Sequence, residues 1–431
     1  MSGPKYPGFD TLSLHAGHQP DSATGSRTVP IYQSVAFVFN DHDEAASRFN
    51  IARSGYVYSR IANPTVAALE ERLAMLEDGV GAVATASGMA AIHLALVTLA
   101  SSGSHIVASR ALYGGTHNLL TYTLPRFGIS TTFVDPRDPE AFAAAVRPET
   151  VLMFTETVAN PGGEVADIPA LADAAHAAGV PLMVDATLST PYLLQPLRMG
   201  ADIVIHSLTK FIGGHGATLG GVVIDGGRFD WMQAPSRFPT LCAPYAGFHD
   251  LNFAEEFGPT AYIIRARREG LRDFGAALSA MSASQLLQGV ETLSLRMDKH
   301  VSNAQTVAEY LEAHAAVERV AYPGLVSHPD HELAARLLPR GSGAVFSFEV
   351  CGGREAGRKL IESLELISHL ANVGDAKSLV IHPASTTHSR MDDEALAEAG
   401  IAPGMVRLSI GLENVDDLIA DLARALHRSQ K

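Results

Sequence analysis

The sequence predicts an α/β protein that consists of a large domain with a mostly parallel β-sheet and a smaller C-terminal α/β domain. Short apolar runs alternate with helical patterns between residues 80 and 225, a long helical stretch follows at 291–314, and three more apolar runs lie beyond residue 340. Runs of β-branched residues separated by amphipathic stretches are typical of βαβ units, whose parallel sheet is covered by helices on both faces.

Seven apolar runs are expected to form the strands of the large sheet. They are GAVATA, SHIVASR, STTFVD, VLMFTET, PLMVDA, ADIVIHS and LGGVVID. The stretch from Gly79 to Ser109 has no Asp, Glu, Lys or Arg. Because glycine, serine and threonine interrupt it, we expect a strand, a turn and a buried helix there and no transmembrane span. The runs GAVFSFEV, SLVIHP and MVRLSIGLE are expected to be strands of the smaller domain.

Composition and charge exclude several classes of function. The 431 residues include 46 acidic and 32 basic side chains, which give a net charge of -14 and no electrostatic footprint for nucleic acid or an anionic membrane. The two cysteines, Cys242 and Cys351, have no metal-ligand spacing and favour a reducing compartment. The N-terminus lacks the basic and apolar regions of a signal peptide, so we expect a cytoplasmic protein.

Ligands of parallel sheets bind beyond the carboxyl ends of the strands. The run ADIVIHS leads directly into LTKFIGGHG, which places Ser207, Thr209 and Lys210 at this edge. Two hydroxyl groups and the N–H groups of a glycine-rich turn form a cradle for phosphate, with the ammonium group within reach of the same ligand. Taken alone, the segment is more typical of a solvated lysine in a loop.

A carboxylate is expected at the same edge, because the run PLMVDA ends in Asp185 and is followed by Thr187. A cofactor with a pyridine nitrogen needs an anionic partner to stay protonated, and its aldehyde needs a lysine. Asp185 and Lys210 supply both groups. The alternative for the aspartate is the cap of a helix.

Three more segments place polar or aromatic groups at strand ends. Ser87, Gly88 and Met89 lie between a strand and a helix whose free N–H groups can bind phosphate oxygens. Tyr113 could stack on a flat heteroaromatic ring, and Asn160 could hydrogen-bond a ring substituent. Their alternatives are a plain turn, a core tyrosine and an Asn-Pro turn. All of these segments fall at the ends of strands of one sheet, which favours a common site.

These motifs identify a family. The segments YSRIANPT, ASGMAA, LYGGTHN, ETVANP, VDAT, HSLTKFIGGHG, NVGDAKSLVIHPASTTH and VRLSIGLE resemble the cysteine and methionine metabolism family of pyridoxal 5′-phosphate enzymes over nearly the whole chain. Within it, HSLTKFIGGHGATLGG, the segment after Gly226 and ETLSLRM are most similar to the O-acetylhomoserine sulfhydrylases. The resemblance implies the fold type I of these enzymes, which is that of aspartate aminotransferase.

The resemblance also implies a role for each residue. Lys210 would carry the cofactor as a Schiff base and act as a base, Asp185 would pair with the pyridine nitrogen, and Tyr113 would stack on the ring and donate a proton. The remaining cofactor contacts would come from Ser87, Gly88, Met89, Asn160, Thr187, Ser207 and Thr209. Tyr58 and Arg60 are similar to a pair that reaches the phosphate in the neighbouring subunit.

The substrate's α-carboxylate would be bound by the smaller domain. Arg407 lies in the run MVRLSIGLE, and its guanidinium group matches a carboxylate in a bidentate geometry. A salt bridge on the face of the strand is the alternative. By resemblance, Asn372 and Thr387 would lie near the same carboxylate.

The implied reaction is a γ-replacement, in which O-acetyl-L-homoserine and sulfide or methanethiol give homocysteine or methionine and acetate. Cystathionine γ-synthase, O-succinylhomoserine sulfhydrylase and methionine γ-lyase activities remain alternatives, as does a binding protein of this fold without turnover. The lyases usually carry Cys where Gly115 stands.

The implied assembly is a homotetramer built from dimers with shared active sites. We expect residues 1–60 to form an arm that reaches the neighbouring site, 61–290 the cofactor-binding domain with an insertion at about 226–275, and 291–431 a linking helix and the smaller domain.

Overall fold

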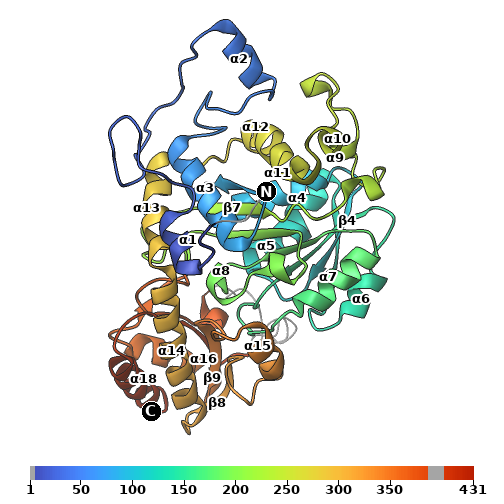
Figure 1. The fold of residues 1–431 in the computed structure, drawn as a ribbon. Helices are drawn as coiled ribbons and strands as arrows, with labels where there is room; N and C mark the ends of the chain where they lie inside the picture. The colour runs from blue at the N-terminus through green and yellow to red at the C-terminus, as the bar shows by residue number, and fades with distance from the viewer. Residues whose placement is uncertain (1–4, 387–401) are drawn as a thin grey trace.

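The computed structural model describes residues 5–386 and 402–431 and contains two β-sheets in two bodies of different size (Figure 1). The larger sheet has seven strands in the order β1-β7-β6-β5-β4-β2-β3. Its strands are β1 (Gly81–Thr85), β2 (His105–Ser109), β3 (Ser130–Val134), β4 (Thr150–Glu156), β5 (Leu182–Asp185), β6 (Ile203–Ser207) and β7 (Gly221–Asp225). Each coincides with one of the seven predicted runs, and β4 begins one residue before its run. Neighbours from β6 to β3 are parallel, whereas β7 is antiparallel to β1 and β6.

Helices surround both sheets. They are α1 (Phe9–His15), α2 (His42–Phe49), α3 (Pro64–Glu77), α4 (Gly88–Leu99), α5 (Gly114–Asn118), α6 (Pro139–Ala144), α7 (Ile168–Ala177), α8 (Thr190–Leu193), α9 (Pro239–Cys242), α10 (Phe253–Phe257), α11 (Ala261–Arg265), α12 (Arg272–Phe274), α13 (Ala280–Glu291), α14 (Leu293–Glu312), α15 (His331–Leu337), α16 (Gly353–Ser363) and α18 (Val415–Ser429). Among the described residues, no helix is long and apolar enough to cross a membrane. The uncharged stretch at 79–109 forms β1, α4 and β2, as the sequence predicts.

The seven-stranded sheet is buried on both faces, which explains its continuous apolar runs. Alternate residues of a strand point to opposite faces, and in β6 Val204 joins the core on one face while Ile203 and Ile205 join the core on the other. Leucines of α3 and α7 pack on the first face, and α4 and α11 pack on the second. The predicted α/β fold is confirmed.

Capping side chains fix where several of these helices begin. Asn63 accepts a hydrogen bond from the N–H of Thr65 at 3.0 Å before α3, and Ser87 accepts one from Ala90 at 3.1 Å before α4. Such caps satisfy N–H groups that have no partner inside the helix. The Ser87 cap therefore sets the start of α4 directly after β1.

The second sheet has five strands in the order β10-β11-β12-β9-β8. They are β8 (Val317–Ala321), β9 (Val345–Val350), β10 (Ser368–His369), β11 (Leu379–Ile381) and β12 (Met405–Ser409). The three C-terminal apolar runs form β9, β11 and β12. Helices α16 and α18 pack on each other and beside this sheet (Figure 1).

Two segments lie outside these layers. Residues 226–275, predicted to be an irregular insertion, contain the short helices α9 to α12, and their aromatic side chains join the core on the α4 face of the sheet. The chain around α2 extends away from both bodies (Figure 1). It exposes apolar side chains such as Val35, Val38 and Phe49. The predicted domain boundaries stay a prediction.

Helix α14 connects the two bodies and anchors the loop that follows β6. The buried guanidinium group of Arg296 on α14 donates hydrogen bonds to the carbonyl oxygens of Phe211 at 2.6 Å, Ile212 at 3.1 Å and Gly289 at 2.5 Å. Burial lowers the pKa of Arg296 to about 10, so the group stays protonated at neutral pH. The chain just after Lys210 is therefore tied to α14.

Replacing this guanidinium group is expected to destabilise the fold. Arg296→Met leaves the three carbonyl groups without their donors and should lower the free energy of unfolding by about 3 kcal/mol, because buried polar groups without partners are costly. Denaturant unfolding measures the change. The control Arg319→Gln alters an arginine that is 64% exposed and should change stability by less than about 0.5 kcal/mol. Equal effects of both substitutions would contradict the anchoring role.

Candidate active site

A pocket of about 230 Å³ opens at the carboxyl ends of β4, β5 and β6, facing the start of α4. Its lining residues are Ser87, Gly88, Met89, Ile92, Tyr113, Glu156, Val158, Asn160, Asp185, Thr187, Leu188, Ser207, Thr209, Lys210, Leu219, Ala371, Asn372, Val373 and Arg407. The structure therefore brings together nearly all of the residues predicted from the sequence. Tyr58 and Arg60 do not line it, and Thr387 lies outside the described residues.

One end of the pocket is a turn packed tightly against β6. A Cβ atom added to Gly88 would lie 2.6 Å from the Cβ of Ser207, so only glycine allows this approach. The N–H of Ser207 donates to the hydroxyl of Thr187 at 2.8 Å, and the hydroxyl of Thr209 accepts from the N–H of Gly220 at 3.1 Å. Hydroxyl groups and the N-terminus of α4 thus converge on one place, which suits a phosphate group.

Asp185 ends β5 as a buried carboxyl group. It accepts a hydrogen bond from the N–H of Thr187 at 2.9 Å. Burial raises its pKa, and the hydrogen bonds from Thr187 act in the opposite direction. A cationic partner in the pocket would stabilise its ionised form.

Glu156 is a second buried carboxyl group, which the sequence analysis missed. It ends β4 directly opposite Asp185 in the register of the two strands, and it accepts the main-chain N–H of Tyr113 at 2.6 Å. Burial, and after it the charge of Asp185, raise the pKa of Glu156 well above its usual range. The run VLMFTE ends in this polar residue at the same sheet edge as Asp185, so the strand end itself was a local signal for Glu156.

The opposite wall comes from the five-stranded sheet. The Nζ atom of Lys210 donates to Oδ1 of Asn372 at 2.6 Å, and Nη2 of Arg407 donates to the carbonyl oxygen of Asn372 at 3.2 Å. Burial, and after it the charge of Arg407, lower the pKa of Lys210. Burial also lowers the pKa of Arg407 to about 10, which leaves it cationic at neutral pH.

The ring of Tyr113 lies at the mouth of the pocket and is half exposed. A Cβ atom added to Gly115 would lie 2.5 Å from Cε1 of this ring and 3.2 Å from Sδ of Met89. The Tyr113 ring can therefore lie beside Met89 only because residue 115 has no side chain.

These residues fit pyridoxal phosphate. The hydroxyl groups and the α4 N-terminus match a phosphate, Asp185 matches a protonated ring nitrogen, and Lys210 matches an aldehyde. An unsatisfied group supports the fit as well, since the buried Oδ1 atom of Asn160 has no hydrogen-bond partner among the described residues. Because buried polar groups are normally hydrogen-bonded, a ligand in the pocket would supply the missing partner.

Tyr58 and Arg60 lie away from this pocket in their own chain. The Arg60 guanidinium group lies over the Tyr58 ring, 5.2 Å from its centre, and donates to the carbonyl oxygen of Arg272. Tyr58 and Arg60 thus contact each other and do not line the pocket of their own chain.

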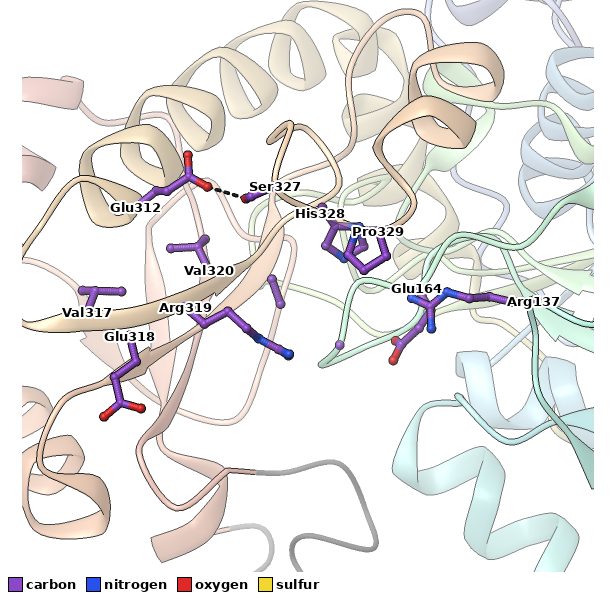
Figure 2. A pocket seen from close by; sticks show the side chains of 12 residues that line it. Arg137, Glu164, Glu312, Val317, Glu318, Arg319, Val320, Ser327, His328 and Pro329 are labelled. Carbon is purple, nitrogen blue, oxygen red and sulfur yellow. Dashed lines mark hydrogen bonds between the residues drawn. The ribbon is translucent and has the colours of Figure 1, made fainter.

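A larger cavity of about 400 Å³ lies between the two sheets, and none of the predicted residues lines it (Figure 2). Its lining comes from Arg137 and Glu164 on one side and from β8 and the segment after it on the other (Figure 2). Arg137 is held by Asp330 through two hydrogen bonds of 2.7 Å. Its other charged groups, such as Glu318 and Arg319, are exposed. We assign the chemistry to the smaller pocket.

Comparisons with known proteins show the family of this chain. The model of the Cys/Met metabolism PLP-dependent enzyme family matches residues 10–427. A homocysteine synthase of Schizosaccharomyces pombe is 50% identical over 97% of this chain and 98% of its own length. An O-acetyl-L-homoserine sulfhydrylase of Leptospira meyeri is 49% identical over 97% of this chain and 96% of its own.

A solved structure is similar as well. It is described as an O-acetylhomoserine (thiol)-lyase of Campylobacter jejuni with N′-pyridoxyl-lysine-5′-monophosphate at one position. It superimposes with a TM-score of 0.93 at 40% identity and covers 97% of this chain and 99% of that one. Because the family model matches almost the whole length of this chain, the chain belongs to the Cys/Met metabolism family of PLP-dependent enzymes.

Proposed function

We propose that this enzyme replaces the acetyl ester of O-acetyl-L-homoserine by sulfide, or by methanethiol, to give L-homocysteine, or methionine, and acetate. The observation that carries the proposal is the single pocket in which Lys210, Asp185 and Arg407 meet. Relatives with about half of their residues in common are named for this substrate or this product. In the reaction the Cγ–O bond breaks, acetate leaves with the electron pair, and a C–S bond forms at Cγ.

Pyridoxal phosphate, when bound, supplies an aldehyde that condenses with an amine and a protonated ring that accepts electrons. The side chains of the chain do the rest. Lys210, an amine of lowered pKa, is suited to take the proton from Cα. Asp185 would keep the ring nitrogen protonated, and Tyr113 at the mouth of the pocket would donate a proton during loss of acetate. Ser87, Ser207 and Thr209 would hold the phosphate.

The lining favours a small uncharged acyl group. The cations among the described lining residues are Lys210 and Arg407, and both lie on the Asn372 side of the pocket. Leu188 and Leu219 supply apolar surface elsewhere. A succinyl group carries a second carboxylate, which would need a further cation when it is desolvated. This supports acetyl over succinyl.

The assembly is the second part of the proposal. We propose a homodimer, paired further into a tetramer, in which Tyr58 and Arg60 of one subunit contact the phosphate site of the other. The position of both residues outside their own pocket and the exposed apolar side chains around α2 support this. A cytoplasmic location stays a prediction of the sequence.

The reaction can be tested directly with the purified, cofactor-loaded enzyme. With O-acetyl-L-homoserine, acetate release should depend on sulfide, and homocysteine should form in equal amount. Lys210→Ala should abolish turnover and the covalent attachment of cofactor that borohydride reduction and mass spectrometry detect. Lys299→Ala, at an exposed position, serves as the control and should retain both. Equally fast acetate release without sulfide would favour a lyase.

Arg407 is expected to control substrate binding. Arg407→Ala removes the partner of the α-carboxylate and should raise KM for O-acetyl-L-homoserine by an amount equivalent to roughly 2–5 kcal/mol. Steady-state kinetics with saturating sulfide measure this change. An unaltered KM would mean that the carboxylate binds elsewhere.

Shared sites predict complementation between two inactive variants. Arg60→Ala and Lys210→Ala should each be nearly inactive alone, because every site then lacks one component. After subunit exchange, half of the dimers contain both subunits and have one intact site, so about a quarter of wild-type activity should return. Native mass spectrometry verifies the exchange. A mixture that exchanges and stays inactive would contradict the shared site.

A further inference from the structure

Glu156 is a buried group in the lining of the pocket that the proposed mechanism does not use. It is 7% exposed, it ends β4, and one of its carboxyl oxygens accepts the main-chain N–H of Tyr113 at 2.6 Å. Tyr113 directly precedes α5, and its own side chain makes no capping hydrogen bond there. The bond to Glu156 therefore fixes the corner from which the Tyr113 ring projects into the pocket.

The register of the sheet places Glu156 beside another carboxyl group. Glu156 and Asp185 are paired residues of the neighbouring parallel strands β4 and β5, and such strands lie about 4.8 Å apart. At paired positions of this kind the charge of one buried carboxyl group raises the pKa of the other, and the charge of Asp185 does so for Glu156. This favours a state in which one of the pair keeps its proton.

The surroundings decide which of the two keeps it. Asp185 is stabilised in its ionised form by hydrogen bonds from Thr187. For Glu156, burial, the charge of Asp185 and, more weakly, that of Glu164 all raise the pKa, and only the N–H of Tyr113 opposes them. The cations that line the same pocket, Lys210 and Arg407, are held by Asn372.

We propose that Glu156 is a positioning residue that acts as a neutral carboxylic acid, holding the main chain of Tyr113 in place while Asp185 alone carries the negative charge of the pair. This inference rests on the roles proposed above for Asp185 and Tyr113. A neutral acid suits this position, because it accepts the N–H through its carbonyl oxygen and leaves the pairing with a cationic ring to Asp185.

Three substitutions in the cofactor-loaded enzyme test the proposal. Glu156→Ala removes the acceptor, so kcat should fall about 100-fold through misplacement of Tyr113, with a smaller change in KM. Glu156→Gln restores a neutral acceptor and should recover kcat to within about tenfold of wild type. Asp185→Asn should weaken the equilibrium binding of pyridoxal phosphate much more than Glu156→Gln does, because only Asp185 has to be charged.

Two outcomes would overturn the proposal. One is that Glu156→Gln is as damaging as Glu156→Ala, since the negative charge of Glu156 would then be required. The other is that Asp185→Asn is tolerated while Glu156→Gln loses the cofactor, since the charge would then lie on Glu156.

The proton that Glu156 is proposed to keep should also make the stability of the folded enzyme depend on pH. Above pH about 4.3 the unfolded chain releases the proton of this glutamate while the folded enzyme keeps it, so wild type loses stability as the pH rises toward the folded pKa. A glutamine has no such proton. The melting temperature of Glu156→Gln relative to wild type should therefore increase between pH 5 and pH 8 (roughly the range that this linkage covers).

A matched control is Glu318→Gln, at an exposed glutamate, which should show no such trend. A difference between Glu156→Gln and wild type that stays flat or falls with pH would show that Glu156 is ionised in the folded enzyme. Cofactor binding and melting do not involve the substrate. They therefore test this inference even if the wild-type enzyme fails to replace acetate by sulfide.

Discussion

The parallel pairing of β4, β5 and β6 is the constraint on which the site depends. Since these strands run in one direction, their last residues, Glu156, Asp185 and Ser207, lie at the same edge of the sheet; Glu156 pairs with Asp185, and Ser207 lies just beyond Ile205, the partner of Asp185. Apolar contacts on both faces of the sheet fix these strand ends in position, because the side chains of each strand point alternately into two buried cores. Polar groups placed there are removed from water by the fold itself, which shifts the pKa values of the two carboxyl groups and of the nearby lysine.

Much of this arrangement follows from the sequence, since strand ends and glycine-rich turns are local signals. The seven strands and the pocket residues that follow them were predictable for this reason. Glu156 ends a predictable strand as well, but its pairing with Asp185 was not predictable, because the two residues are 29 positions apart in the chain and meet only through the register of β4 and β5. The contact of Asn372 with Lys210 likewise depends on how the second sheet docks, which no local pattern encodes.

The two sheets are joined around the turn that carries Asn160. The hydroxyl of Ser347 on β9 donates to the carbonyl oxygen of Pro161 at 2.8 Å, and Asp330 accepts both from Arg137 and from the N–H of Val165. Hydrogen bonds from the second body thus support a wall of the pocket that the first body builds. Both bodies therefore contribute to the site, and on its other side Lys210 of the first body donates a hydrogen bond to Asn372 of the second.

The bonds of Arg296 also constrain how this sequence can diverge. Its guanidinium group donates hydrogen bonds to the carbonyl oxygens of Phe211 and Ile212. A Cβ atom added to Gly289 would lie 2.5 Å from the same Ile212 oxygen. Helix α13, helix α14 and the chain after Lys210 therefore share one set of contacts. Because the acceptors are main-chain oxygens, these bonds leave the side chains at 211 and 212 free to change, whereas Arg296 and Gly289 are both constrained by the same Ile212 carbonyl group.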